Sequence, residues 1–380
     1  MKILIPTILS TSRTVGVAEY LVNLIKNLQE IDTGNEYYIL TAFYNSKMFN
    51  LQSKNFHEIK VHIYDLSRMF LRFNYYFWQF IYFRGLIKKL KIDIVHFPCP
   101  WFIPSNIKSV VTVHDITEFH IQKYSLINNY IKKKMIKKTF EMSSDIIVVS
   151  GSTFTDISKY FRGNIYTIYN GVGGTSQKVN RPEILRKYNL LTQKYFVFIG
   201  TLQKHKNIDN LIEAYNIFSS LHAEIKLVLI GKKDNALNEI NKKIKKFNLE
   251  NSVQITGYLS EEEKDSILQE AFCLLYPSLY EGFGFPILDA QSRGIPVITS
   301  NISSMPEVAG DGALLVDPKD PESIAIAMAE LIKNNKLRIE LINEGFENVK
   351  RFSWEKCAEY TMKVYNNICA TSPEINRENL

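Results

Sequence analysis

The chain has 380 residues, of which 46% are hydrophobic and 22% charged, and its 46 Lys and Arg against 39 Asp and Glu give a net charge of +7. This composition excludes a mainly disordered or collagen-like chain, and the length predicts two domains. The four cysteines are widely separated, which argues against a zinc knuckle or a disulfide framework and favours a reducing compartment. A basic balance indicates an anionic partner, without distinguishing nucleic acid, phospholipid and phosphate.

Short β-branched runs alternate with segments of helical length along the whole chain. In the first half, strands are expected at residues 2–6, 37–41, 60–63, 93–97, 110–114, 145–150 and 165–169, and helices at 17–30 and 124–142. In the second half, strands are expected at 195–199, 226–230, 253–256, 272–276 and 296–299. Continuous apolar strands separated by helices are typical of a parallel sheet covered on both faces. The chain is therefore predicted to be α/β, with two doubly wound, Rossmann-like domains.

The boundary between the two domains is predicted at residues 170–176, where three glycines fall within four positions and indicate a flexible link. The domains then cover residues 1–170 and 171–380. The first holds 21 Lys and Arg against 12 Asp and Glu, a net charge of +9, and the second holds 25 against 27, a net charge of −2. The positive charge therefore belongs to the first domain.

The strongest local motif covers residues 276–290, at the end of a predicted strand and the start of a helix. Gly282 and Gly284 let a ligand approach the backbone, and free N–H groups at a helix start bind anions. Two carboxylates, Glu281 and Asp289, are suited to accept hydrogen bonds from hydroxyl groups. Phosphate donors beside hydroxyl acceptors suit a nucleotide sugar, and the plain alternative is an ordinary strand-to-helix turn with solvated carboxylates.

Three weaker signals lie at other strand ends. Gly200 and Lys206 follow a predicted strand and precede a helix, so Lys206 can neutralise a diphosphate; the alternative is a solvated basic loop. Gly16 follows the first strand, where it serves either the approach of a ligand or only the turn. His114 ends a strand at the place where α/β proteins bind ligands, and the alternative is a hydrogen-bonded structural histidine.

Several familiar site motifs are missing from the sequence. It contains no Gly-x-Gly-x-x-Gly dinucleotide fingerprint and no Gly-Lys-Ser/Thr phosphate loop. It also contains no Asp-x-Asp pair and no His-x-x-x-His, so no metal site is expected.

Taken in order, these segments resemble the retaining glycosyltransferases of family 4, also called group 1 glycosyltransferases. The residues that carry the resemblance are Gly16, Val-Thr-Val-His114-Asp, Val-Val-Ser150-Gly-Ser, Ile-Tyr-Asn170-Gly-Val, Gly200-Thr-Leu-Gln-Lys-His-Lys206-Asn, Gly257-Tyr-Leu-Ser, Glu281-Gly-Phe-Gly-Phe-Pro-Ile-Leu-Asp289 and the segment 296–310. The resemblance implies the GT-B fold, in which two Rossmann-like domains face each other across a cleft. It implies that the first domain binds the acceptor, that the second binds a nucleotide-sugar donor, and that a last helix at about residues 353–370 packs back on the first domain.

The resemblance also implies roles for individual residues. Three are implied to be catalytic: His114, Lys206 and Glu281. The implied donor-binding residues are Gly16, Gly200, Thr201, His205, Tyr258, Leu259, Gly282, Phe283, Gly284, Phe285 and Asp289. This sequence departs from the family at two of these positions, because Thr201 stands where arginine is frequent and Asp289 where glutamate is usual.

The implied activity is transfer of a sugar, with retention of configuration, from a nucleotide-diphosphate sugar to a saccharide or lipid-linked saccharide in cell-surface polysaccharide biosynthesis. No metal or other cofactor is expected, because Lys206 and the amides of residues 282–285 can stabilise the leaving diphosphate. The family is thought to use front-face attack, so Glu281 is not expected to be a nucleophile. The alternative from another class is a catalytically silent nucleotide-sugar-binding protein. An epimerase fits the motifs less well, and no motif supports nucleic-acid binding.

Two segments of the first domain bear on the acceptor and on location. Residues 69–83 are strongly aromatic, but polar side chains interrupt them and they do not predict a transmembrane helix. Residues 130–138 combine five lysines with apolar side chains. Such segments are typical of a protein that rests on anionic lipid, and a buried aromatic core beside a solvated lysine face explains them equally well. We expect a cytoplasmic protein that is peripheral at the inner face of a membrane.

Overall fold

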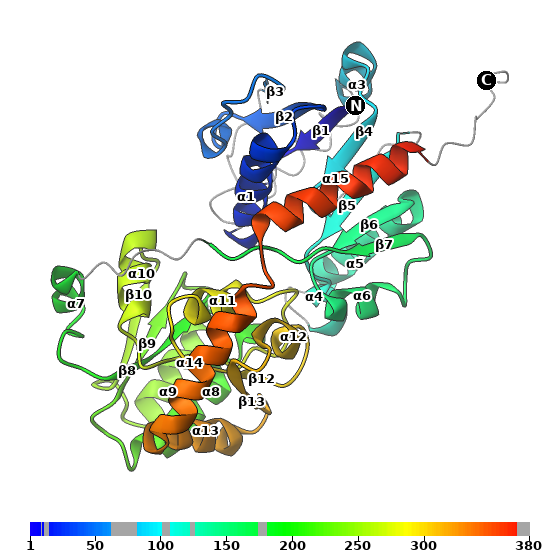
Figure 1. Ribbon diagram of the computed structural model, residues 1–380. Helices are drawn as coiled ribbons and strands as arrows, with labels where there is room; N and C mark the ends of the chain where they lie inside the picture. The colour runs from blue at the N-terminus through cyan, green and yellow to red at the C-terminus, as the bar shows by residue number, and fades with distance from the viewer. Residues whose placement is uncertain are drawn as a thin grey trace. The chain divides into compact units, whose positions relative to one another are not determined.

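A computed structural model of the chain describes residues 1–8, 10, 15–61, 82–100, 107–121, 126–173 and 181–370 (Figure 1). The chain forms two compact units. The first comprises Met1–Glu118, Tyr124–Gly171 and Ser353–Leu380, and the second comprises Phe119–Lys123 and Val172–Phe352. Residues 69–81 of the aromatic segment 69–83 lie outside the described residues. Among the described helices, none combines the length and the apolar character needed to cross a membrane.

The first unit contains a seven-stranded parallel sheet with the order β3-β2-β1-β4-β5-β6-β7. Its strands are β1 (Lys2–Pro6), β2 (Glu36–Ala42), β3 (Phe56–Val61), β4 (Ile94–Phe97), β5 (Ser109–Val113), β6 (Asp145–Val148) and β7 (Asn164–Thr167). The helices in this part of the chain are α1 (Val15–Ile31), α3 (Arg84–Leu90), α4 (Thr117–His120), α5 (Leu126–Met142) and α6 (Gly151–Ile157). Every residue of β4, β5 and β6 is buried, as expected for apolar strands that helices cover on both faces.

The second unit contains a six-stranded parallel sheet with the order β10-β9-β8-β11-β12-β13. Its strands are β8 (Tyr195–Ile199), β9 (Lys226–Ile230), β10 (Val253–Gly257), β11 (Cys273–Tyr276), β12 (Val297–Ser300) and β13 (Ala313–Val316). Its helices are α7 (Pro182–Lys187), α8 (Ile208–Ser219), α9 (Leu237–Lys246), α10 (Glu261–Gln269), α11 (Phe285–Gln291), α12 (Met305–Ala309), α13 (Pro321–Lys333) and α14 (Asn335–Val349), with a 3-10 turn, η3, at Lys204–Lys206. Two doubly wound parallel sheets confirm the predicted fold class.

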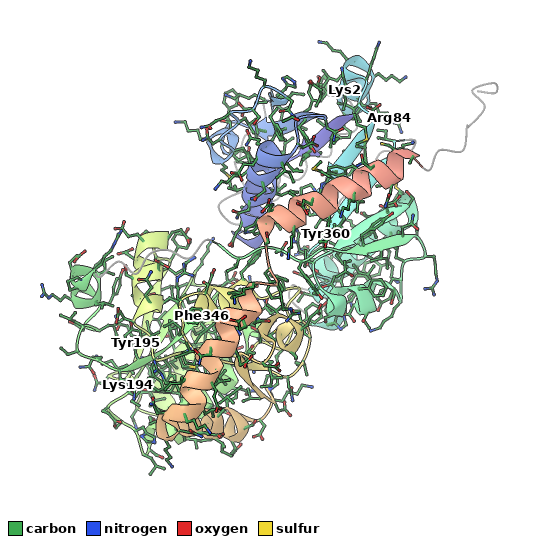
Figure 2. The ribbon with its side chains drawn as sticks, viewed as in Figure 1. Lys2, Arg84, Lys194, Tyr195, Phe346 and Tyr360 are labelled. Carbon is green, nitrogen blue, oxygen red and sulfur yellow. The ribbon has the colours of Figure 1, made fainter. Side chains whose placement is uncertain are left out.

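Both sheets reverse their strand order at one position, between β1 and β4 in the first unit and between β8 and β11 in the second. Ligands of doubly wound proteins bind at the carboxyl ends of the strands that flank such a reversal. The opposite, amino end of β8 is anchored in the core, because Tyr195, its first residue and labelled in Figure 2, is buried and donates its hydroxyl proton to the carbonyl oxygen of Ile267 at 2.7 Å. A ligand of the second unit is therefore expected at the loops after β8 and β11.

The sequence analysis missed strand β13. This strand has only four residues and pairs with β12 at the edge of the sheet, where Leu315 is 46% exposed. A short, half-exposed edge strand lacks the continuous apolar run by which buried strands are recognised.

The glycine-rich boundary is better packed than its composition predicts. Asn170 is fully buried, and a Cβ added at Gly171 would lie 2.3 Å from the backbone nitrogen of Trp354. Gly171 is therefore required for a close approach of two backbones within the first unit, rather than for flexibility. Residues 174–180 of this segment lie outside the described residues.

Helix α15 (Trp354–Ala370) follows the second unit in the chain and belongs to the first, where it packs on α1. Its Tyr365 hydroxyl is hydrogen-bonded to Nδ1 of the buried His96 at 2.6 Å. His96 Nε2 is in turn 2.7 Å from the Thr112 hydroxyl, which also contacts the Tyr20 hydroxyl at 3.1 Å. This buried polar chain joins α15 and α1 to strands β4 and β5.

Candidate active site

A buried ion pair lies at the carboxyl end of the second sheet. Lys206 Nζ donates a hydrogen bond to Glu281 Oε1 at 2.6 Å and another to the Tyr276 hydroxyl at 2.8 Å. The side chains of Lys206 and Glu281 are only 11% and 13% exposed. The two charged residues come from the loops after β8 and β11, which flank the reversal of strand order. The structure thus brings together two residues that the sequence analysis selected separately.

The backbone around Lys206 holds its side chain in this position. Asn207 adopts a left-handed conformation with φ of 60°, which ends η3, and its side-chain amide donates to the carbonyl oxygen of Pro277 at 3.0 Å. This bond ties the loop after β8 to the loop after β11. A Cβ added at Gly200 would lie 3.6 Å from Lys206 Cε and 3.2 Å from the Phe198 ring. The absence of a side chain at Gly200 therefore leaves room beside the lysine.

The loop after β11 turns sharply and is braced by serines. Gly284 has φ of 121°, a conformation that favours glycine, and it is the N-cap of α11, which has Pro286 in its first turn. The Ser303 hydroxyl donates to the carbonyl oxygen of Glu281 at 2.7 Å, and the Ser304 hydroxyl donates to that of Phe283 at 2.7 Å. These contacts fix the backbone that carries Glu281.

The surroundings of Glu281 determine its ionisation. Burial is the largest single influence and disfavours the carboxylate, but the charge and hydrogen bond of Lys206, together with His205 and Ser278, outweigh it, and the pKa of Glu281 is lowered. Burial also raises the pKa of Tyr276 well above its ordinary value, and the charge of Glu281 adds to this rise. At neutral pH the group consists of an ammonium, a carboxylate and a neutral phenol.

Asp289 lies on α11 and faces different partners. The carbonyl oxygen of Asp289 accepts a hydrogen bond from Arg293 Nη1 at 2.8 Å, and its Oδ1 lies 3.9 Å from the same atom. Arg293 Nε is bound to Asp265 at 2.5 Å. Burial raises the pKa of Asp289. No hydrogen bond joins Asp289 to Lys206 or Glu281 in the described part of the chain. The two predicted carboxylates therefore do not belong to one hydrogen-bonded group.

The other residues implied for the second unit differ in accessibility. Gly200 and Thr201 follow β8 directly, and His205 is a buried residue of η3. Tyr258 and Leu259 follow β10, and Tyr258 is 67% exposed whereas Leu259 is buried.

In the motif that begins α11, Gly282 and Gly284 are buried. The Phe283 ring packs against the rings of Phe285 and Phe352 at centroid distances of 5.3 and 5.7 Å. Phe283 is only 5% exposed, so its ring belongs to the core and its backbone is what remains for a ligand.

The first unit holds the two remaining predicted site residues. Gly16 lies in the first turn of α1 rather than in a loop that precedes the helix. His114 directly follows β5, and its Nε2 donates a hydrogen bond to the carbonyl oxygen of Pro98 at 3.1 Å. Burial lowers the pKa of His114 to about 4, so the ring is neutral at pH 7 and its Nδ1 carries a lone pair. The Tyr20 ring packs edge-on against it at 4.8 Å.

Sequence reasoning assigned no role to Tyr276 or to the two bracing serines. Tyr276 is the last residue of β11 and was visible only as an apolar position of a strand. The serines fall within residues 300–304, where three serines at and just after the end of a strand are the one available signal. Among the described residues, no group of three or more His, Cys, Asp and Glu comes together as a metal site.

Two family models match the chain and together cover most of it. One, described as Glycosyl transferases group 1, matches residues 180–348, and the other, described as Glycosyltransferase Family 4, matches residues 15–173. The chain belongs to the group 1, family 4 glycosyltransferases. It is therefore a glycosyltransferase, and the resemblance seen in the sequence is confirmed.

Curated relatives agree with this assignment. The chain is 29% identical over 292 residues to O-antigen chain mannosyltransferase B of Escherichia coli, a match that covers 73% of this chain and 75% of the relative. It is 28% identical over 256 residues to O-antigen chain mannosyltransferase RfbU of Salmonella typhimurium, with 67% and 68% covered. An uncharacterized glycosyltransferase of Methanocaldococcus jannaschii is 28% identical over 378 residues, with 97% and 99% covered.

Solved structures share the fold. Sucrose-phosphate synthase from Thermosynechococcus elongatus has a TM-score of 0.77 at 18% identity, with 98% of this chain and 100% of that chain covered. Anabaena Alr3699/HepE in complex with UDP and glucose has a TM-score of 0.73 at 14% identity, with 96% and 99% covered. At such identities the likeness concerns the fold alone, and the fold is GT-B.

Proposed function

We propose that this glycosyltransferase transfers a hexose, with retention of configuration, from a nucleotide-diphosphate sugar to a saccharide or lipid-linked saccharide during cell-surface polysaccharide synthesis. The observation that carries the proposal is the buried pair of Lys206 and Glu281 at the carboxyl end of the second sheet. The names of the relatives support a mannosyl donor and an O-antigen type of product. That HepE was solved with UDP and glucose supports a nucleotide sugar as donor.

In this proposal the second unit binds the donor. The Lys206 ammonium faces the diphosphate and stabilises the negative charge that develops as the nucleotide leaves, together with backbone amides of residues 282–285. No metal or other cofactor is required, because these groups neutralise the leaving group directly. Asp289 binds the ribose hydroxyls, and Tyr258 and Leu259 lie beside the base.

Retention follows from attack on the same face from which the nucleotide departs. Glu281 is suited to hold Lys206, because its Oε1 accepts a hydrogen bond from the lysine. Its carboxylate is also suited to accept hydrogen bonds from donor hydroxyls. We therefore assign it to binding and charge control rather than to nucleophilic attack. The leaving phosphate accepts the proton of the acceptor hydroxyl, while a sugar–oxygen bond to the acceptor replaces the sugar–phosphate bond.

The first unit binds the acceptor and rests on an anionic membrane surface. The outer face of α5 begins with four exposed apolar side chains: Leu126 at 75%, Ile127 at 73%, Tyr130 at 67% and Ile131 at 48%. It continues with exposed lysines at positions 134, 137 and 138. Apolar side chains followed by cations suit insertion at the interface of anionic lipid.

Co-sedimentation with phosphatidylglycerol vesicles at low salt tests the membrane surface. The wild-type chain should pellet with the vesicles, and Leu126→Ser combined with Ile127→Ser should reduce the bound fraction severalfold. Leu221→Ser is the matched control, because Leu221 is equally exposed, at 79%, but belongs to the second unit. Absence of wild-type binding at low salt would remove the membrane from the proposal.

A thermal-shift screen of nucleotide sugars tests the donor, since the tightest donor should stabilise the chain most. The best donor is then offered with saccharide acceptors, and transfer and donor hydrolysis are measured by release of nucleotide diphosphate. Lys206→Ala and Glu281→Ala should each lower turnover on the order of 100-fold or more in a folded protein, and near-normal turnover in both would reject the site. Nucleotide binding without transfer or hydrolysis across the whole donor panel would instead favour a catalytically silent binding protein.

A further inference from the structure

A cavity of about 160 Å³ lies within the first unit. Of the residues that line it, only His114 has been given a role so far. Its walls come from α5, from the start of α1, from α4 and from the loops after β4 and β5. The residues that line it are Val17, Cys99, Pro100, His114, Asp115, Glu118, Lys132, Met135 and Ile136. For scale, a cavity of roughly 150 Å³ in an apolar core holds one benzene ring. The cavity is therefore of the size for a single six-membered ring.

One wall of the cavity carries a partly buried ion pair. Lys132 Nζ is 2.9 Å from Glu118 Oε1, and the two side chains are 19% and 11% exposed. The backbone of Glu118 is held as well, because its carbonyl oxygen accepts a hydrogen bond from the Asn129 side chain at 3.1 Å. Asp115 is braced by Thr117, whose backbone N–H and hydroxyl both donate to Asp115 Oδ1. These polar groups are fixed in place before any ligand arrives.

The remaining polar group of the cavity is the imidazole of His114. Its Nε2 proton is committed to the carbonyl oxygen of Pro98, which leaves Nδ1 as a hydrogen-bond acceptor. The rest of the lining is largely apolar and includes Val17, Met135 and Ile136. A few fixed polar groups in an otherwise apolar lining are what a specific small-molecule site requires. A sugar ring presents hydroxyl groups at its edge and C–H bonds on its face, so it matches both parts of this lining.

The charges of the cavity decide between a sugar and a phosphate. Among the described residues that line the cavity there are two carboxylates, Asp115 and Glu118, and one ammonium, Lys132, and the neutral His114 adds no charge. An incoming phosphate would meet a net negative wall and be repelled, whereas hydroxyl groups can donate to the carboxylates. The other lysines of α5 that stand exposed, at positions 134, 137 and 138, do not line the cavity.

We propose that this cavity binds one neutral sugar ring of the acceptor, with Glu118 accepting hydrogen bonds from ring hydroxyls and Lys132 donating to a hydroxyl or ring oxygen. The assignment of this ring to the acceptor rests on the proposed function. Glu118 and Lys132 are then specificity-determining residues on the acceptor side, and any phosphate or lipid of the acceptor stays outside the cavity.

Binding is tested by saturation-transfer NMR on the full chain, with methyl α-mannoside and methyl α-glucoside as probes and inorganic phosphate as competitor. At least one glycoside should receive saturation, and equimolar phosphate should not displace it. Glu118→Gln should weaken the affinity for this glycoside about tenfold, because each hydrogen bond to the charged carboxylate is lost or weakened. Lys132→Met provides a second variant with similar side-chain volume and the same expected loss.

Lys134→Gln is the matched control, since it removes a lysine from the exposed face of the same helix and should bind like wild type. Displacement of the glycoside by phosphate, wild-type affinity in both cavity variants, or no binding of either glycoside would overturn the proposal. The thermal midpoint of each variant reports on folding.

The failure of this proposal can be told apart from failure of the proposed function. Donor hydrolysis without acceptor tests Lys206 in the second unit, whereas the acceptor KM tests the cavity, and Glu118→Gln should raise this KM about tenfold. An unchanged acceptor KM would overturn the cavity and leave the transferase intact. Absence of any hydrolysis or transfer by the wild-type chain would overturn the transferase, whatever the glycoside data show.

Discussion

The two units use the carboxyl ends of two similar parallel sheets in different ways. In the second unit the loops after β8 and β11 hold an ion pair, Lys206 and Glu281, 2.6 Å apart. In the first unit the loop after β5 holds His114, which burial keeps neutral at pH 7. The same strand topology thus provides a position for a ligand, and the side chains at that position determine which chemistry takes place there.

The two halves of the chain also differ in net charge. Residues 1–170 carry +9 and residues 171–380 carry −2, yet the charged group with the clearest catalytic geometry lies in the acidic half. A single well-placed ammonium is enough to stabilise a leaving diphosphate, whereas exposed lysines act over a surface. In the proposed function, the basic excess of residues 1–170 therefore serves contact with an anionic surface rather than the reaction.

The largest expected effect comes from Lys206→Ala. Loss of one preorganised electrostatic contact to the leaving group should lower kcat on the order of 100-fold or more. Lys204→Ala is the matched control, because Lys204 lies in the same turn but pairs at the surface with Glu239. Steady-state release of nucleotide diphosphate measures both. Equal rates in the two variants would contradict a special role for the buried pair.

A pH effect on stability should come from the first unit. Burial lowers the pKa of His96 to about 3 and that of His114 to about 4, against about 6.5 in an unfolded chain. Between pH 6.5 and 4 the unfolded state therefore binds more protons, so stability is complete above pH 6.5 and is lost as the pH falls. At pH 5 each histidine should cost about 2 kcal/mol relative to pH 7.

Urea unfolding at pH 7 and pH 5 measures this loss, and His114→Asn should reduce it by about half. Glu281 adds nothing to it, because its lowered pKa keeps the carboxylate ionised over this range. A pH dependence that His114→Asn leaves unchanged would show that His114 does not differ in protonation between the folded and unfolded states.

Asp289→Asn should act on donor binding rather than on the chemical step. Loss of the charged acceptor for ribose hydroxyls is expected to raise the donor KM about tenfold with kcat little changed. Asp311→Asn removes an exposed carboxylate from the same unit and serves as the control. A fall in kcat at constant KM would move Asp289 from the ribose to the reaction centre.

The smallest expected effect is that of Tyr276→Phe, which removes the second hydrogen-bond partner of Lys206. A net contribution of about 1 kcal/mol predicts a fall in kcat of about fivefold, with the donor KM nearly unchanged. Tyr195→Phe is the matched control, since the Tyr195 hydroxyl is bound to a backbone carbonyl, at Ile267, and should affect only stability. A kcat equal to that of wild type would show that Glu281 alone positions the lysine.

Much of the fold could be predicted because buried parallel strands have continuous apolar sequences. The strands at 195–199 and 226–230 coincide with β8 and β9, whereas β13 was missed because an exposed edge strand has no such signal. Gly171 illustrates the opposite case. The glycine-rich stretch predicts flexibility, but the backbone of Trp354, which is distant in the sequence, lies directly against Gly171. Local composition does not report a backbone contact made by a distant segment.

The sequence by itself determined the α/β class, the two-domain rhythm and the glycosyltransferase resemblance, because these depend on local periodicity and on motifs read within one loop. Only the tertiary structure decided that Lys206 and Glu281, which are 75 positions apart, form one buried pair with Tyr276 as a third member. It also divided the lysines of α5, turning Lys132 toward Glu118 and leaving Lys134 exposed. The physical reason is that charge chemistry depends on distance and burial, which the packing of distant segments sets.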